Sequence, residues 1–400
     1  MTKWVTKKFD DFFDMLPTNT LSRDKLNDQF GIYQNIHYGD VLIKYPFCLD
    51  CSNNEIPYIN EGENFNKTEL KDGDVVFADT AEDDTVGKCV EVLNVGDKKI
   101  VSGLHTYLCR PKFEMAPGYL GYFLNSDAFH NQLLRYIAGS KVSSVNKTSI
   151  KNTSIFYPES LAEQRRIAGI LSSADGAIAA SEALIAKYRN IKRGLLATLL
   201  QPKEGWKKVK LGECCEKITD GSHDSPKPVD DGFYMPSVKD MRYDDFDFSN
   251  CKQISKIDFE RLKGTGCKPE IGDVLIAKDG SILKYCFVVK QDLPIVVLSS
   301  IAILRPNQSI VDGKYLSYYF QKQDVVTDVV ENYKSGTGVP RIVLRNFEQI
   351  EIHLPDLTEQ RRIAEILSSV DAKIAAEEKV VEKYKGVKKG LMEEMMRSGK

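Results

Sequence analysis

The chain has 400 residues, of which 42% are hydrophobic and 28% charged, and its formal net charge is −2 at pH 7. This composition is typical of a soluble globular protein with two or three domains. No stretch has 18 consecutive apolar residues, and the first residues, MTKWVTKKFDDFF, lack the apolar core of a signal peptide. We therefore expect a cytoplasmic protein with no membrane partner. A near-neutral total charge does not exclude nucleic acid, because phosphate contacts need only a local basic face.

The nine cysteines show no regular spacing, which is typical of a reducing compartment. Cys48 and Cys51 form one CxxC, but no second CxxC or histidine pair would complete a tetrahedral zinc site. We therefore predict no metal site on this chain.

The first half alternates short β-like segments with turn signals from Trp4 to Phe156. Among these segments is GDVVFAD, which begins at Gly73. An amphipathic segment follows at 117–137, and then a polar loop at 139–146.

The second half repeats this order with different side chains. GDVLIAKDG at 272–280 corresponds to the segment at Gly73, and the loop at 336–341 corresponds to the loop at 139–146. We infer a tandem pseudo-repeat in which one framework carries two different surfaces.

The two halves end in near-copies, 163–200 and 359–396, which are identical at about half of their positions. Ser160–Glu163 and Asp356–Glu359 have capping-box spacing, so each copy is predicted to be a helix about 60 Å long. A heptad pattern of apolar or small residues favours pairing of the two helices with each other. The alternative is that each helix only closes the core of its own half. The pattern comprises Ile167, Leu171, Ala174, Ile178, Ser181, Ile185 and Tyr188 in the first copy and Ile363, Leu367, Val370, Ile374, Glu377, Val381 and Tyr384 in the second.

The sequence contains no catalytic motif whose residues could act together. It has no Asn/Asp-Pro-Pro-Tyr/Phe or FxGxG motif of an adenine methyltransferase, and no GxxxxGK[ST] of a P-loop motor. A nuclease-like match joins Asp356 to Glu377 and Lys379, but one helix would hold these residues about 30 Å apart. We therefore predict no catalytic residue and a protein that is not itself an enzyme.

Loops rich in Ser, Thr, Asn, Lys and Arg occur at matching places in both halves, and such side chains contact phosphates and base edges. The alternative for each loop is an ordinary solvated turn, and for His223 a hydrogen-bonding role in the fold. The predicted DNA-binding residues are Ser140, Lys141, Ser143, Asn146 and Lys147 in the first half and His223, Ser225, Lys278, Ser281, Lys284, Lys334, Thr337, Arg341 and Arg345 in the second.

These features together resemble the specificity subunit of a Type I restriction–modification system. The resemblance covers nearly the whole chain and is carried by EQRRIAxILSSxD in both helices and by ITDGSHDSP, GDVLIAKDGS and SGTGVPRI in the second half. The first half departs from the family pattern, since it has GDVVFADTAEDD and YPES where AKDG and LPDL would be expected. The first half is therefore expected to carry a target-recognition domain of a different kind.

The resemblance implies an α+β protein with two mixed α/β target-recognition domains separated by two long, antiparallel conserved helices. It also implies double-stranded DNA as a partner and two modification subunits that bind S-adenosylmethionine. A restriction motor–nuclease subunit that uses ATP and Mg can join the complex, and no cofactor is expected on this chain. The alternative is a similar recognition subunit of another methyltransferase-containing system, of Type IIG or IIB kind. We expect a first recognition domain at 1–157, a helix at 158–200, a linker at 201–206, a second recognition domain at 207–354 and a helix at 355–400.

Apolar residues outside the heptad pattern usually mark an interface, so we predict a surface on the helices for a modification subunit. Arg165, Arg166, Arg361 and Arg362 in the first turns are either surface charges paired with glutamates or contacts to a partner or phosphate. The predicted partner-binding residues are Ile170, Leu195, Leu196, Ile366, Leu391 and Met392.

Overall fold

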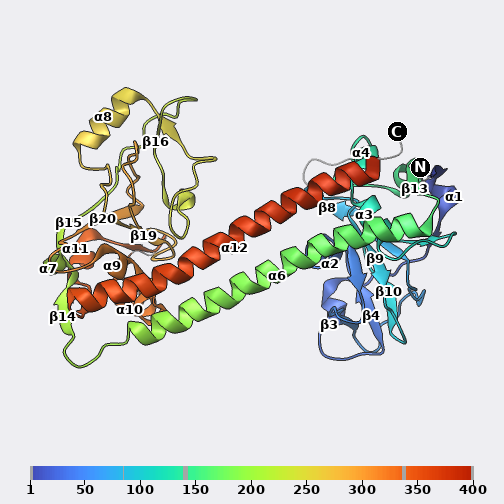
Figure 1. Cartoon of the computed structure of the whole chain (residues 1–400), viewed down its shortest axis with the longest axis horizontal. Coiled ribbons are helices and arrows are strands. Elements are labelled where there is room, and N and C mark those ends of the chain that lie inside the picture. Colours follow the sequence, from blue (N-terminus) through green and yellow to red (C-terminus); the bar gives the residue numbers. More distant parts are fainter. Residues whose placement is uncertain (1–2, 84, 138–142, 336–338, 398–400) are drawn as a thin grey trace. The chain divides into compact units, whose positions relative to one another are not determined.

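The computed structural model describes residues 3–83, 85–137, 143–335 and 339–397 (Figure 1). The chain divides into two compact units, unit 1 with residues 1–182 and 379–400 and unit 2 with residues 183–378. The two long helices, α6 (Leu161–Leu199) and α12 (Leu357–Arg397), each contribute residues to both units. The compact units thus divide each long helix, whereas the sequence-based segments assign each helix to one segment.

The globular part of unit 1 is built on a five-stranded mixed sheet with the order β2-β11-β7-β9-β5. A second sheet, β10-β4-β6-β3, is formed mainly by the chain between β2 and β7, and β1 pairs with β13 next to the start of α6. The elements of unit 1 are β1 (Trp4–Lys8), α1 (Phe9–Phe12), β2 (Phe13–Leu16), η1 (Arg23–Lys25), β3 (Leu26–Asn27), β4 (Tyr33–Ile36), α2 (Tyr38–Ile43), β5 (Cys48–Asp50), β6 (Tyr58–Ile59), β7 (Val75–Ala78), β8 (Thr80–Ala81), β9 (Cys89–Leu93), β10 (Lys99–Ser102), β11 (Thr106–Pro111), α3 (Tyr119–Leu124), α4 (Asp127–Leu134), β12 (Ser143–Ser144), α5 (Lys147–Lys151) and β13 (Ser154–Pro158).

Unit 2 repeats the central framework with the sheet order β15-β20-β18-β19. The chain between β15 and β18 differs from its counterpart in unit 1, because it forms the small pair β16-β17 and helix α8. The elements of unit 2 are β14 (Lys207–Lys210), α7 (Leu211–Cys214), β15 (Cys215–Asp220), β16 (Phe233–Tyr234), η2 (Val238–Asp240), β17 (Gln253–Ile254), α8 (Lys256–Gly264), β18 (Val274–Ala277), β19 (Cys286–Val288), β20 (Ile301–Pro306), α9 (Gly313–Tyr319), α10 (Gln323–Tyr333), β21 (Lys334–Ser335), β22 (Arg341–Ile342), α11 (Leu344–Gln349) and β23 (Glu351–Leu354).

The repeated Gly-Asp-Val sequence has the same structural role in both units. Gly73 and Gly272 adopt φ of +85° and +91°, a backbone conformation that favours glycine. The aspartate that follows is buried and pairs with an arginine of the neighbouring strand, at 2.7 Å between Asp74 and Arg110 and 2.9 Å between Asp273 and Arg305. The repeat therefore fixes the start of the central strand in each sheet.

Ion pairs within each unit show that the two long helices run antiparallel. In unit 1, Asp175 pairs with Lys388 and Glu182 with Lys385; in unit 2, Arg189 pairs with Glu378 and Lys192 with Asp371. In both units the residue number rises along α6 as it falls along α12. The predicted fold class, with its tandem pseudo-repeat and long antiparallel helices, is confirmed.

The start of each long helix closes the core of a globular domain. Ile167 and Leu171 belong to the hydrophobic core of unit 1, and Ile363 and Leu367 to that of unit 2. At these positions the heptad pattern therefore serves core closure, the alternative interpretation of the pattern. Each long helix therefore closes a core with some of its residues and pairs with the other helix through others.

The predicted capping boxes form only in part. Ser160 Oγ accepts a hydrogen bond from Glu163 N, and Asp356 Oδ1 accepts one from Glu359 N. The Glu163 carboxylate, however, accepts two hydrogen bonds from Arg166, at 2.7 and 2.9 Å. Arg166 is thus a surface charge paired with a glutamate, one of the two predicted alternatives.

By length and composition alone, α6 is apolar enough to cross a membrane. Its two ends have other environments, since Ile167 lies in the core of unit 1 and Leu200, just after the helix, in the core of unit 2. The ends of α6 thus pack in the cores of the two units.

Candidate DNA interface

The two units share one backbone arrangement at the end of the central strand. In unit 2, Lys278 N donates to Ser300 O at 3.0 Å, and Lys278 O accepts from Ile342 N at 3.0 Å. In unit 1, Asp79 N donates to His105 O at 3.1 Å, and Asp79 O accepts from Val145 N at 2.9 Å. Lys278 and Ser300 therefore occupy the positions that Asp79 and His105 occupy in unit 1. The same framework carries different side chains there.

In unit 2 this arrangement brings together three predicted loops. Lys278 Nζ lies 3.3 Å from Asp220 Oδ2 and 3.2 Å from Asp279 Oδ1. The exposed His223 ring contributes Nε2 at 3.3 Å from Asp220 Oδ2. Arg341 joins the group through a bridge between its backbone and that of Asp279. Segments 220–223, 278–281 and 340–342 thus form one surface, which we name the unit 2 loop surface.

Lys278, which we predicted to contact DNA, is buried in unit 2. Its side chain is 6% exposed and its ammonium group lies between two carboxylates. A buried lysine needs such partners, because an unpaired charge in the interior is strongly unfavourable. Lys278 therefore holds Asp220 and Asp279 in place within the loop surface.

The other predicted residues of unit 2 have varied environments. Arg341 and Arg345 are exposed, as are Ser281 and Lys284. Lys334 lies in the β21–β22 hairpin, opposite Ile342. Ser225 accepts a hydrogen bond from Lys252 at 2.7 Å. Thr337 lies outside the described residues.

In unit 1, two of the predicted residues, Ser140 and Lys141, lie outside the described residues. Ser143 pairs with Ala81 in the short β12–β8 ladder, and the Lys147 ammonium lies 5.6 Å from the centre of the Tyr107 ring. Asn146 caps α5, since its Oδ1 accepts hydrogen bonds from the backbone and the hydroxyl of Ser149. The structure therefore gives Asn146 a role in the fold as the cap of α5.

Sequence reasoning missed the polar group that Asp79 and His105 form at the end of the central strand of unit 1. Asp79 Oδ1 lies 3.2 Å from His105 Nδ1 and accepts a hydrogen bond from Thr80 Oγ1 at 2.7 Å. Burial and the neighbouring Asp79 carboxylate raise the pKa of Tyr107 to about 12, so its hydroxyl stays protonated at neutral pH. Alignment of GDVVFAD with GDVLIAK would have pointed to Asp79, because it places Asp79 opposite Lys278. No sequence motif marks His105.

The apolar residues predicted to bind a partner divide into two groups. Leu196 and Met392 are buried in the cores of unit 2 and unit 1, and Leu195 and Leu391 pack against these cores. Leu196 and Met392 therefore cannot form an exposed docking surface, and Leu195 and Leu391 serve mainly to anchor the helix ends. Ile170 and Ile366 are half-buried and remain candidates.

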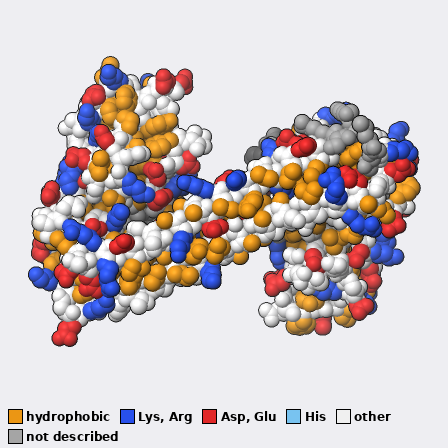
Figure 2. Space-filling model, in the orientation of Figure 1, with side chains coloured by type: hydrophobic (Ala, Val, Ile, Leu, Met, Phe, Trp, Pro, Cys, Tyr) orange, Lys and Arg blue, Asp and Glu red, His pale blue; other side chains and the backbone are white. Residues whose placement is uncertain are grey.

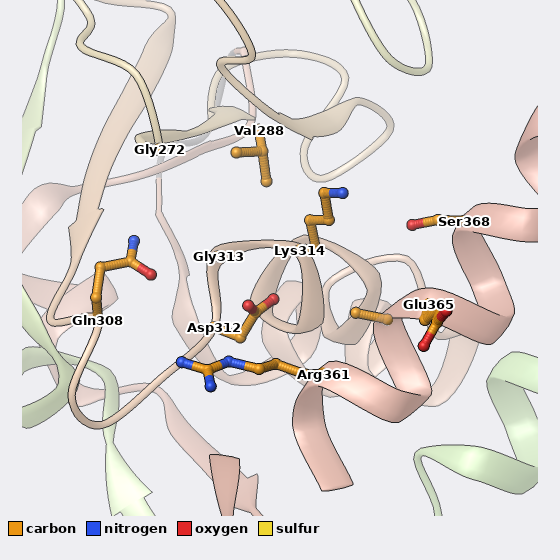
Figure 3. Close-up of a pocket in the computed structure, with 10 residues that line it drawn as sticks. Gly272, Val288, Gln308, Asp312, Gly313, Lys314, Arg361, Glu365 and Ser368 are labelled. Carbon is orange, nitrogen blue, oxygen red and sulfur yellow. The ribbon is translucent and has the colours of Figure 1, made fainter. Parts of the chain in front are cut away.

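A cavity of about 400 Å³ lies in unit 2 between α9 and the first turns of α12 (Figure 3). Arg361 extends from α12 toward Asp312, and Lys314 and Glu365 add charges of both signs to the wall. The lining residues are Gly272, Val288, Gln308, Asp312, Gly313, Lys314, Arg361, Ala364, Glu365 and Ser368.

Unit 1 has a buried carboxylate where this cavity has Val288. Glu91 and Val288 pair with the first residues of equivalent strands, Val75 and Val274. The Glu91 carboxylate accepts hydrogen bonds from the backbone N–H groups of Gly118 and Gly121, at 2.8 and 2.7 Å. Burial raises the pKa of Glu91 to about 7, although these hydrogen bonds oppose the shift.

Among the described residues, no group of three or more His, Cys, Asp or Glu side chains is arranged to hold a metal ion. The unit 2 loop surface and the Asp79–His105 group instead offer hydrogen-bond donors and acceptors at the rim of a rigid sheet. Such groups suit recognition of a polar partner.

Comparison with known proteins identifies the family of this chain. The family model for the Type I restriction modification DNA specificity domain matches residues 1–187 and 203–383. One curated relative is a Methanocaldococcus jannaschii protein, by name the MjaX specificity subunit of a type I restriction enzyme. It is 27% identical over 360 residues, which cover 82% of this chain and 79% of that protein. The MjaVIII specificity subunit of the same organism is 32% identical over 127 residues, 32% of this chain and 28% of that protein.

Two solved structures share the fold along the whole chain. The S subunit of a Type I restriction–modification system from M. genitalium is similar with a TM-score of 0.56 at 14% identity, over 98% of this chain and 96% of that one. A structure from a study of the assembly and conformational transition of the type I R-M system gives a TM-score of 0.57 at 18% identity, over 99% and 98%. The chain therefore belongs to the Type I restriction–modification DNA specificity family, with one specificity domain in each half, and is a DNA-recognition subunit of a family in which catalysis lies in other subunits.

Proposed function

We propose that each unit recognises one half-site of a bipartite, asymmetric DNA target and that α6 and α12 set the number of unread base pairs between the half-sites. The observation that carries this proposal is the shared strand-end arrangement. Asp79 and His105 stand in unit 1 where Lys278 and Ser300 stand in unit 2. Two units that present different hydrogen-bonding groups on the same backbone arrangement are expected to recognise two different base sequences.

The two units also differ in the segment inserted between the same two strands. In unit 1 this segment forms β3, β4 and β6, which make one sheet with β10, whereas in unit 2 it forms β16-β17 and α8. Loops and insertions on a rigid framework are where binding specificity usually lies. This difference supports an asymmetric target.

The proposal extends to partners and cofactors. Two modification subunits would bind the long helices and supply S-adenosylmethionine, and a restriction motor–nuclease subunit that uses ATP and Mg would join them in the cytoplasm. Figure 2 shows apolar side chains along the helices. On α6, Ile191 is 42% exposed and Ile170 is half-buried, and on α12 Ile366 is half-buried. Apolar side chains on the surface of a long helix suit a protein partner.

Exchange of residues 1–156 for those of a relative tests the proposal. The full complex with modification subunits would be produced in cells that lack other methyltransferases, and the methylated motif would be determined by methylation-sensitive sequencing. We expect one half-site to change while the other half-site and the spacing stay the same. A chimera that rewrote both half-sites or altered the spacing would refute independent recognition by the two units.

A further inference from the structure

We propose that His105 is a specificity-determining residue of unit 1 and that its Nε2 accepts a hydrogen bond from the exocyclic amino group of an adenine or cytosine in the first half-site. Asp79 is the residue that positions it. The inference rests on the proposed function, because it assigns a chemical preference to one of the two half-sites.

The backbone of His105 has a conformation that side chains other than glycine rarely adopt. Among the described residues other than glycine, only Asn94, His105 and Leu283 have positive φ, and the value for His105 is +55°. Such conformations persist where the surrounding structure enforces them, and they are concentrated at functional sites.

A buried polar network beneath the turn enforces this conformation. Ser102 Oγ and Thr106 Oγ1 are 2.7 Å apart, and Thr106 Oγ1 also donates to Gly103 O at 2.5 Å. Asn19 donates from its backbone and from its side chain to Ser102 O, at 2.9 Å in each case. Both ends of the turn that carries His105 are therefore fixed, and the imidazole is presented by a rigid support.

Asp79 determines which nitrogen of the imidazole faces outward as an acceptor. A carboxylate only accepts hydrogen bonds, so Nδ1, at 3.2 Å from Asp79 Oδ1, carries the proton of the neutral ring. Nε2, on the far side of the ring, is then left with a lone pair. The Tyr38 ring packs edge-on against the imidazole at 5.4 Å, and the His105 side chain is 47% exposed, against 18% for Asp79.

The lone pair of Nε2 defines the class of base that it can recognise. In the major groove, adenine N6 and cytosine N4 are the hydrogen-bond donors, whereas guanine and thymine present acceptors. A fixed acceptor therefore favours adenine or cytosine at one position and disfavours guanine or thymine.

Unit 2 has no imidazole at the corresponding place. Ser300 occupies it, and the Ser300 hydroxyl accepts a hydrogen bond from Val238 N at 3.3 Å. The preference that we assign to His105 should therefore affect the first half-site alone.

The test compares base analogues with a protein variant in the assembled complex of the full chain and its modification subunits. DNA duplexes would carry purine in place of single adenines and 2-pyrimidinone in place of single cytosines, which removes one amino group at a time. For the unaltered chain we expect one such change in the first half-site to weaken binding about tenfold. In His105→Gly this penalty should fall below about twofold, while all penalties in the second half-site persist.

His105→Gly suits this test because glycine adopts φ of +55° freely, so the turn should fold without the ring. Asn94→Gly is the matched control, since Asn94 has φ of +53° in the same unit and should leave every penalty unchanged. In Asp79→Asn, the amide accepts or donates, so the ring is free to expose Nε2–H. This variant should bind guanine or thymine better at the same position.

Two results would overturn the inference. His105→Gly could leave all penalties in the first half-site as they are, or it could weaken specific and non-specific DNA equally, as the loss of a phosphate contact would. Failure of the proposed function would be seen separately, because the unaltered complex would then show no dependence on base identity in two half-sites.

Discussion

In unit 2, Lys192 Nζ on α6 lies 2.7 Å from Asp371 Oδ1 on α12, and Asp371 Oδ2 accepts a hydrogen bond from Tyr318 Oη at 2.7 Å. Unit 1 has the same group, in which Lys388 and Tyr122 bind the two oxygens of the Asp175 carboxylate. Each group joins both long helices to a globular domain. We call them the unit 1 and unit 2 clamps.

The unit 2 clamp should contribute measurably to the stability of its unit. In Lys192→Met, the Asp371 carboxylate loses its cation, and we expect a loss of about 1–2 kcal/mol because the pair is partly buried. Hydrogen exchange of unit 2 peptides would measure this effect. Lys385→Met is the control, since Lys385 and Glu182 form an exposed pair that should contribute less than about 0.5 kcal/mol. Equal effects of the two variants would argue against the clamp.

Glu91 should make the stability of unit 1 depend on pH. The folded unit binds the Glu91 proton more tightly than the unfolded chain does, because burial raises the pKa of Glu91 from 4.5 to about 7. Its stabilising contribution is therefore complete below pH 4.5 and is lost as the pH rises through about 7, by about 3 kcal/mol.

Glu91→Gln removes the titrating group and provides the comparison for this effect. The difference in unfolding free energy between the two proteins should change in favour of the variant as the pH rises from 5 to 8. Denaturant titration followed by signals from unit 1 would measure it. A difference that stays constant over this range would show that Glu91 keeps the same charge in the folded unit throughout.

Lys278 and Arg341 should behave differently although they lie in one loop surface. Lys278→Met leaves Asp220 and Asp279 without their cation, and we expect unit 2 to lose about 2–4 kcal/mol of stability. Arg341 is exposed, so Arg341→Ala should leave the unit folded. Loss of a base contact by Arg341 would cost about 1–3 kcal/mol at one position, and loss of a phosphate contact would weaken binding to all sequences alike.

Thermal unfolding and the methylated motif of the full complex would check both variants. Neither change should alter discrimination at the first half-site. A Lys278→Met protein of unchanged stability, or an Arg341→Ala complex with a changed first half-site, would contradict these assignments.

Substitutions at Ile366 and Leu196 on the long helices should distinguish a loss of partner docking from a loss of folding. Ile366→Glu should weaken co-purification of the modification subunit and leave unit 2 folded, because Ile366 is only half-buried. Leu196→Glu should instead destabilise unit 2 by about 3 kcal/mol or more, since it places a carboxylate in the hydrophobic core. Pull-down assays combined with circular dichroism would distinguish the two effects. Normal co-purification of Ile366→Glu would remove this position from the docking surface.

The sequence by itself determined the features that local patterns specify. The copied helices were predictable from their caps and periodic apolar residues, and the central strands from the Gly-Asp-Val repeats at Gly73 and Gly272. The resemblance to a specificity subunit followed from the same segments. These features depend on residues within a few positions of one another, so a linear pattern records them.

The tertiary structure decided what each polar or apolar side chain faces. Lys278 and Arg341 lie in similar polar loops of the sequence, yet one is buried between carboxylates and the other is exposed. His105 acquires its role from Asp79, which precedes it by 26 residues, and Leu196 is buried by a domain that the chain forms afterwards. Burial and charge pairing depend on which distant segments fold together, and no spacing within one segment contains that information.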